Sequence, residues 1–162
     1  IRGQCPVQPW RKKWMPIALL ILTNSLYGQH DTVLIKSAVQ TFFTGLHSND
    51  SNLIKTTIDS SCFLYSIMQK KDGNTLLEKE GVEEFLLQVT KMKGQNLDEK
   101  LLSYDIKIDG VMAIAWTPYK FYFNGQFSHC GVNVFSLIKR GLQWKIMGIT
   151  DTRRKQGCDE LH

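Results

Sequence analysis

Apolar residues return at helical spacing between His30 and Ser48, where they form one continuous stripe. The members of the stripe are Val33, Leu34, Ala38, Val39, Phe42, Phe43 and Leu46. This pattern predicts a helix with one buried face, and Asp31 is placed to cap its start. Two shorter helices are expected further along the chain, one capped by Asp50 and the other opening at Gly81.

Most of the remaining chain alternates between apolar and polar residues, which is the pattern of β-strands. Residues 91–100 are polar and are predicted to form a loop. Asn124-Gly125 is a strong hairpin signal, because both residue types tolerate the positive φ of a type I′ turn. The predicted strands are residues 62–68, 75–77, 102–108, 111–123, 126–139 and 142–153. Two helices, a hairpin, a third helix and a meander predict one α+β domain over residues 30–158.

The first 28 residues differ from the rest of the chain. Arg11, Lys12 and Lys13 precede a short apolar run over residues 14–22, and a polar exit leads to Gly28. This is the pattern of a secretory signal peptide, and the run is too short to span a bilayer comfortably. We therefore expect residues 1–28 to be a signal peptide, with a possible non-native upstream extension, and the protein to be exported. An uncleaved signal anchor is the alternative.

Charge and cysteine content narrow the function classes. Four basic residues and no acid precede residue 29, so the formal net charge of +5 overstates the charge of the nearly neutral body. A neutral body lacks the electrostatic footprint of a nucleic-acid-binding protein. Three cysteines follow the leader, of which Cys130 and Cys158 either form a disulfide or remain free thiols. No spacing typical of a zinc site is present, so we expect neither a metal nor a cofactor.

The C-terminal part of the chain carries motifs of a known family. The segments WTPYKFYFNGQFSHCGVNVFSLIK, GLQWKI and DTRRKQGC resemble the lumazine-binding group of the nuclear-transport-factor-2-like superfamily, which includes ketosteroid isomerases and SnoaL-like cyclases. The resemblance extends over essentially the whole mature chain. It implies a cone, in which three N-terminal helices pack on a strongly curved antiparallel sheet around a cavity, and a homodimer. It implies no particular reaction, since this fold carries both enzymes and binding proteins.

Side-chain parity across the two hairpins predicts which residues share a face. A two-residue loop at Asn124-Gly125 places Lys120 opposite His129 and Trp116 opposite Asn133. On the next hairpin, parity adds polar residues from the end of the last strand, whereas Asp151 faces away. The predicted ligand-binding set is Trp116, Lys120, Tyr122, His129, Asn133, Thr150, Thr152 and Arg154. Its predicted apolar base consists of Phe135, Leu137, Trp144 and Ile146.

His129 is the sharpest candidate for chemistry, because a neutral imidazole can accept and donate protons near neutral pH. A packing role within the sheet is the simpler interpretation, and both remain open. Trp116 and Tyr122 are suited either to stacking on a flat ligand or to filling a core. Asp151 is predicted to form a structural ion pair with a nearby arginine.

The leading hypothesis is an exported domain that binds a small, partly aromatic molecule in a cone-shaped pocket without a cofactor. One alternative is a cofactor-free isomerase, dehydratase or cyclase that uses His129 as its general base. Another is a dimerisation domain whose cavity is vestigial. We expect a homodimer, no nucleic-acid partner and no permanent membrane anchor.

Overall fold

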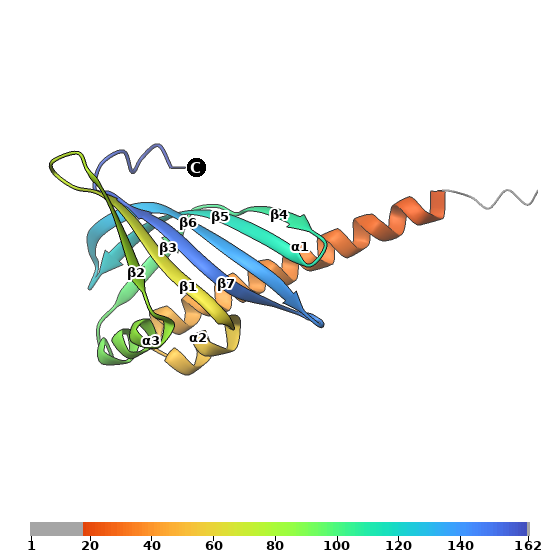
Figure 1. The fold of residues 1–162 in the computed structure, drawn as a ribbon, viewed down its shortest axis with the longest axis horizontal. Coiled ribbons are helices and arrows are strands. Elements are labelled where there is room, and N and C mark those ends of the chain that lie inside the picture. Colours follow the sequence, from red (N-terminus) through yellow and green to blue (C-terminus); the bar gives the residue numbers. More distant parts are fainter. Residues whose placement is uncertain (1–17, 162) are drawn as a thin grey trace, which may run out of the picture.

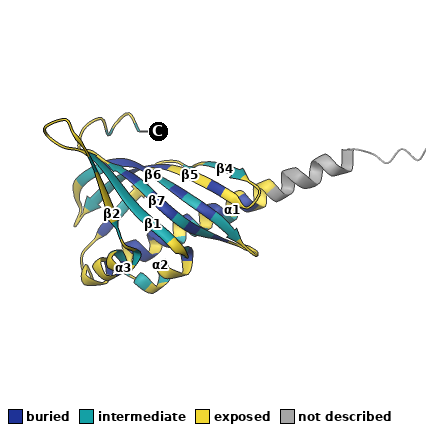
Figure 2. Cartoon of the chain, in the orientation of Figure 1, coloured by how far each residue is buried: buried dark blue, intermediate teal, exposed yellow. Residues whose placement is uncertain are grey.

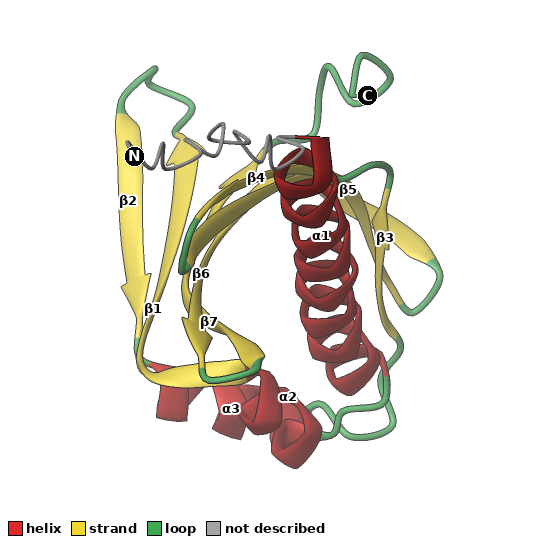
Figure 3. Cartoon of the chain, turned by 90° about the vertical axis from the view of Figure 1, so that its right-hand side faces the viewer, coloured by secondary structure: helices red, strands yellow, loops and turns green. Residues whose placement is uncertain are grey.

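The computed structural model describes residues 18–161, and its sheet curves around the first helix (Figure 1, Figure 3). The helices are α1 (Ala18–His47), α2 (Ser51–Thr57) and α3 (Val82–Lys91). The strands are β1 (Ile58–Gln69), β2 (Thr75–Glu80), β3 (Leu97–Leu101), β4 (Asp105–Asp109), β5 (Met112–Phe123), β6 (Gln126–Arg140) and β7 (Gln143–Arg153). The predicted α+β order and the predicted cone are confirmed.

The sheet is mixed rather than wholly antiparallel. Its strand order is β2-β1-β7-β6-β5-β3, and β4 also pairs with β5. The chain enters the sheet from α2, and β1 then lies beside β7, the last strand, to which it runs parallel. The prediction of antiparallel pairing is correct for β1–β2, β5–β6 and β6–β7, which are consecutive strands joined by short turns.

Helix α1 lies in the hollow of the curved sheet, and α2 and α3 lie at one end of it (Figure 3). The face of α1 that meets the sheet is buried, as the inward-facing dark segments show (Figure 2). It buries Ile35, Val39, Phe42, Phe43 and Leu46, members or neighbours of the predicted stripe. The burial of this apolar face holds helix and sheet together.

Asp31 does not cap a helix, because α1 already begins at Ala18. Its carboxylate accepts hydrogen bonds from Lys139 Nζ at 2.7 Å and from Trp144 Nε1 at 3.0 Å. These bonds tie α1 to the β6–β7 hairpin. Asp50 caps α2 as predicted, since Leu53 N donates to its side chain at 3.0 Å.

Much of the predicted signal peptide, residues 1–17, lies outside the described residues. Residues 18–28 form the first part of α1 and continue without a break into the rest of that helix. Among residues 18–161, no helix meets the length and hydropathy needed to cross a membrane.

The predicted loop over residues 91–100 is wrong in part, because Leu97–Leu101 forms β3. Both β3 and β4 pair with β5, on either side of Pro118. Proline has no backbone N–H to donate, so the partner of β5 changes where a ladder bond would be lost. Residues 102–104 form this break, so the predicted strand 102–108 is observed only as β4, and β3 precedes it.

Two β-bulges shift the register of the meander. The Asn124-Gly125 turn forms as predicted, with φ of 51° and 78°. Beyond it, Tyr122 pairs with Phe127 but Phe121 pairs with His129, which leaves Ser128 as an extra residue. Met147 is the extra residue on β7, since Ser136 pairs with Gly148 and Leu137 with Ile146. Each bulge reverses the faces of all residues beyond it.

Candidate functional site

A cavity of about 210 Å³ lies between the end of α1 and the concave face of the sheet. One part of its wall is apolar and rich in aromatic rings. These residues are Phe42, Phe43, Leu46, Leu64, Tyr65, Phe85, Tyr119, Phe121, Phe135 and Ile149. The remaining lining residues are polar or charged, namely Ser66, Glu80, Glu99, His129, Asn133, Asp151 and Arg153. An apolar hollow with a few convergent polar groups is the usual composition of a small-molecule site.

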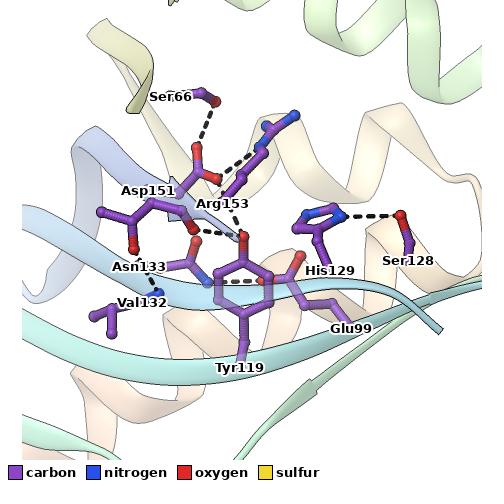
Figure 4. A network of polar contacts seen from close by, with 10 residues as sticks. Ser66, Glu99, Tyr119, Ser128, His129, Val132, Asn133, Asp151 and Arg153 are labelled. Carbon is purple, nitrogen blue, oxygen red and sulfur yellow. Dashed lines mark hydrogen bonds and ion pairs between the residues drawn. The ribbon is translucent and has the colours of Figure 1, made fainter. Parts of the chain in front are cut away.

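Asp151 is the centre of the polar cluster (Figure 4). Ser66 Oγ donates to its Oδ1, while Arg153 Nε and Tyr119 OH donate to its Oδ2 at 2.7 and 3.2 Å. Tyr119 OH also lies 3.0 Å from the Thr152 carbonyl oxygen. Burial raises the pKa of Tyr119 far above its ordinary value, so the phenol stays protonated. The carboxylate of Asp151 is thus held by three donors and neutralised by one guanidinium.

Glu99 reaches the same cavity from β3. Asn133 Nδ2 donates to Glu99 Oε1 at 2.7 Å, and the backbone N–H of Glu99 donates to His47 Nε2 at 3.1 Å. The imidazole of His47 thereby fixes the end of α1 against β3. Burial raises the pKa of Glu99 to about 7, the Asn133 hydrogen bond opposes this rise, and the charge of Asp151 adds to it. Glu99 therefore exchanges its proton near neutral pH.

His129 lines the cavity from β6 and is half-buried. Its ring packs edge-on to Tyr119, with ring centroids 5.7 Å apart, and lies 5.1 Å from the Phe121 ring. Nδ1 shares a hydrogen bond of 3.0 Å with the hydroxyl of Ser128, the bulge residue. Burial, followed by the positive charge of Arg153, lowers the pKa of His129. The imidazole is therefore neutral at pH 7.

The predicted register, and with it the predicted common face, is wrong. His129 and Asn133 line the cavity, but they lie opposite Phe121 and Thr117 rather than Lys120 and Trp116. The bulge at Ser128 is the reason. The predicted residues that do not line the cavity are Trp116, Lys120, Tyr122, Thr150, Thr152 and Arg154.

Several of those residues take part in other contacts. Trp116 is 49% exposed on the outer face of the sheet. Lys120 pairs with Asp159 of the C-terminal tail at 3.1 Å. Thr152 Oγ1 accepts a hydrogen bond from the backbone N–H of Val132. The predicted apolar base of Phe135, Leu137, Trp144 and Ile146 is buried in the core.

The predicted set lacks six lining residues of β3, β5 and β7: Glu99, Tyr119, Phe121, Ile149, Asp151 and Arg153. The predicted ion pair of Asp151 with an arginine exists, but inside the cavity rather than facing away from it. No sequence signal marks either bulge. No strand signal marks Glu99 either, because three consecutive charged residues separate Leu97 from Leu101.

No family model and no curated protein matches the amino-acid sequence. Solved structures do match the fold. The chain has the nuclear-transport-factor-2-like (NTF2-like) fold. An NTF2-like protein from Cytophaga hutchinsonii is 15% identical, with 78% of this chain and 98% of that chain covered and a TM-score of 0.58.

Two further NTF2-fold neighbours have names that refer to enzymes. The beta subunit of a proposed aromatic-ring-hydroxylating dioxygenase from Novosphingobium aromaticivorans is 12% identical, with 80% and 92% of the two chains covered and a TM-score of 0.64. A proposed NTF2-like dehydratase from Streptomyces avermitilis is 11% identical, with 78% and 98% covered and a TM-score of 0.58. Identities this low establish the fold alone. The narrower resemblance to the lumazine-binding group stays a prediction.

A disulfide between Cys130 and Cys158 fastens the C-terminal tail to this NTF2-like sheet. The backbone of Arg154 also pairs with that of Cys130. Of the two open alternatives for these cysteines, the structure has the bridged one. Cys62 is a free thiol, and burial raises its pKa to about 11, so it is unreactive at neutral pH.

Proposed function

We propose that this NTF2-like protein is an exported binding protein that holds a small, partly aromatic molecule in its cone. The observation that carries the proposal is the cavity, in which seven aromatic rings face a compact polar cluster. The rings offer apolar area to a flat ligand, and the cluster offers donors and acceptors that fix its orientation. His129 and Asn133 remain ligand-contact candidates, now joined by Glu99, Asp151 and Arg153.

Export rests on the leader pattern of residues 1–28 and on cysteine chemistry. The disulfide between Cys130 and Cys158 fits an oxidising compartment, where such bonds persist. The domain of residues 30–158 would then act in the periplasm or outside the cell. Mass spectrometry of the mature protein checks this: an N-terminus near residue 29 supports export, and an intact leader contradicts it.

A variant that fills the cavity tests the binding function. Leu64→Trp places an indole where a half-buried leucine lines the cavity, whereas Leu77→Trp makes the same change at a leucine that is 59% exposed and outside it. We expect Leu64→Trp to weaken binding of aromatic fragments at least ten-fold. The indole would occupy part of the cavity, and the fragment would lose the apolar contacts that contribute to its binding free energy. Ligand-observed NMR on both variants measures the effect.

Equal binding by the two tryptophan variants would contradict the proposal, because the fragments would then bind elsewhere. Fluorescence and thermal unfolding of each variant establish that it is folded. If neither the unmodified protein nor the variants bind any fragment, the cavity is vestigial and a dimerisation function gains support.

A second candidate function is cofactor-free proton transfer, with His129 as general base. One observation favours it: Glu99, whose pKa is about 7, and a neutral His129 line the same small cavity. A protonated carboxyl group and a neutral imidazole can act as acid and base on one bound molecule. The dehydratase name of one neighbour is compatible with this chemistry.

A further inference from the structure

The charges in the cavity are unequal in sign. Three carboxyl groups line it, those of Glu80, Glu99 and Asp151, but only one guanidinium, that of Arg153. Arg153 Nε is bonded to Asp151 at 2.7 Å, so this positive charge is already matched. The side chain of Arg153 is also 42% exposed, which places much of it in solvent. When Glu80 and Glu99 are ionised, the cavity therefore carries an excess of negative charge.

Glu99 is the carboxyl group best placed to meet a ligand. One of its oxygens accepts the Asn133 hydrogen bond, and the other accepts none from the part of the chain that the structure describes. Asp151, in contrast, receives donors at both oxygens. A donor on the ligand can therefore bond to Glu99 without displacing a contact within the protein.

The aromatic wall suits the same kind of ligand. The faces of phenylalanine and tyrosine rings attract cations, and this attraction is stronger when water is excluded. A buried ammonium group without a partner carries a large desolvation cost, and a facing carboxylate offsets it. A cavity of about 210 Å³ has room for one aromatic ring with a short chain, since a cavity of about 150 Å³ already admits benzene.

From this arrangement we infer that the cavity selects an organic cation, an amine with an apolar or aromatic body, whose ammonium group binds Glu99. The inference rests on the proposed binding function and specifies its ligand class. The rings of α1, α3 and the sheet would cover the body of the ligand. Asn133 holds the Glu99 carboxylate in position from β6.

Binding of a cation should be linked to pH through Glu99. Around this group lie His47 on α1, Tyr119 on β5, His129 and Asn133 on β6, and Asp151 and Arg153 on β7. The pKa of Glu99 is about 7 in the free protein, and a bound ammonium favours the ionised form. Affinity for the cation should therefore be highest above pH 7 and fall as Glu99 takes up its proton. Protonation of His129 at lower pH acts in the same direction.

Three probes of matched shape separate the ligand classes: phenylpropylamine, phenylpropanamide and phenylpropanoate, which are a cation, a neutral molecule and an anion. Binding is measured by NMR titration at about pH 8 and about pH 6. We expect the amine to bind most tightly at the higher pH and roughly ten-fold more weakly at the lower pH. Glu99→Gln should remove most of that pH dependence, whereas Glu78→Gln, the same change at an exposed site outside the cavity, should not.

The outcomes distinguish a wrong ligand class from a failure of the binding function itself. If the amide or the anion binds more tightly than the amine, and Leu64→Trp still blocks it, the cavity binds ligands but the cation inference is overturned. Amine binding that Glu99→Gln leaves unchanged overturns it as well. If none of the three probes binds the unmodified protein, the proposed binding function and this inference fail together.

Discussion

Two ionisable side chains of the cavity depart from their ordinary titration behaviour in opposite directions. Burial raises the pKa of Glu99 to about 7 and lowers that of His129 below its ordinary value. The usual order of a carboxylic acid and an imidazole is thereby reversed. Near neutral pH the carboxyl group still holds its proton in part of the molecules, while the imidazole has lost its own. Desolvation is the common cause, because it disfavours the charged form of each group.

An NMR titration of the free protein checks this reversal. We expect the Glu99 side-chain carbon to titrate with a midpoint near 7 and the His129 ring below about 6.5. Asn133→Leu should raise the Glu99 midpoint further, since the lost hydrogen bond stabilises the carboxylate. Glu99→Gln assigns the signal. A Glu99 midpoint near the ordinary glutamate pKa would contradict the acid–base pair, and so would a His129 midpoint above the ordinary histidine pKa.

At the scale of elements, local patterns predicted which segments form helices and strands but not how the strands align. The helical stripe, the Asp50 cap and the Asn124-Gly125 turn were all readable, because each depends on residues close in sequence. The bulges at Ser128 and Met147 depend on how a curved sheet closes around α1, which no local pattern records. Six of the eight predicted ligand-binding residues therefore lie outside the cavity.

The hydrogen bonds of Asp31 connect α1 to the β6–β7 hairpin, and a stability measurement tests their contribution. Asp31→Ala leaves the indole N–H of the buried Trp144 without its acceptor, so we expect a loss of about 1–3 kcal/mol in the free energy of unfolding. Asp31→Asn keeps an acceptor and should cost less. Denaturant unfolding, followed by circular dichroism, measures both.

The pH dependence of the Asp31 effect has a definite sign. The Lys139 hydrogen bond lowers the pKa of Asp31, so its contribution is present above the pKa of the unfolded chain and disappears as pH falls through the folded value. The difference between Asp31→Ala and the unmodified protein should therefore shrink below about pH 4. A constant difference down to pH 2 would show that the ion pair does not stabilise the fold.

At the scale of the whole molecule, the two faces of the sheet differ in what they contact. The concave face covers α1 and the cavity, while the outer face of β5 exposes Met112, Ile114 and Trp116. The neighbouring strand β4 sets Asp105, Lys107 and Asp109 beside them, so that the apolar row is bordered by both signs of charge. A twofold axis brings the same surface of two copies together. The acidic and basic side chains that border the row in one copy can then pair with residues of opposite charge in the other copy.

We propose that this outer row forms the homodimer interface, and size-exclusion chromatography with light scattering tests it. Trp116→Lys places a charge in the centre of the row, so we expect the dimer to dissociate at least ten-fold more readily, with the thermal stability of the monomer unchanged. Leu142→Lys is the matched control, because this leucine is 87% exposed in the β6–β7 turn and does not belong to the row. A dimer that survives Trp116→Lys but not Leu142→Lys would place the interface elsewhere, and a protein that is monomeric at all concentrations would exclude it. Because Trp116 does not line the cavity, Trp116→Lys should also leave fragment binding intact.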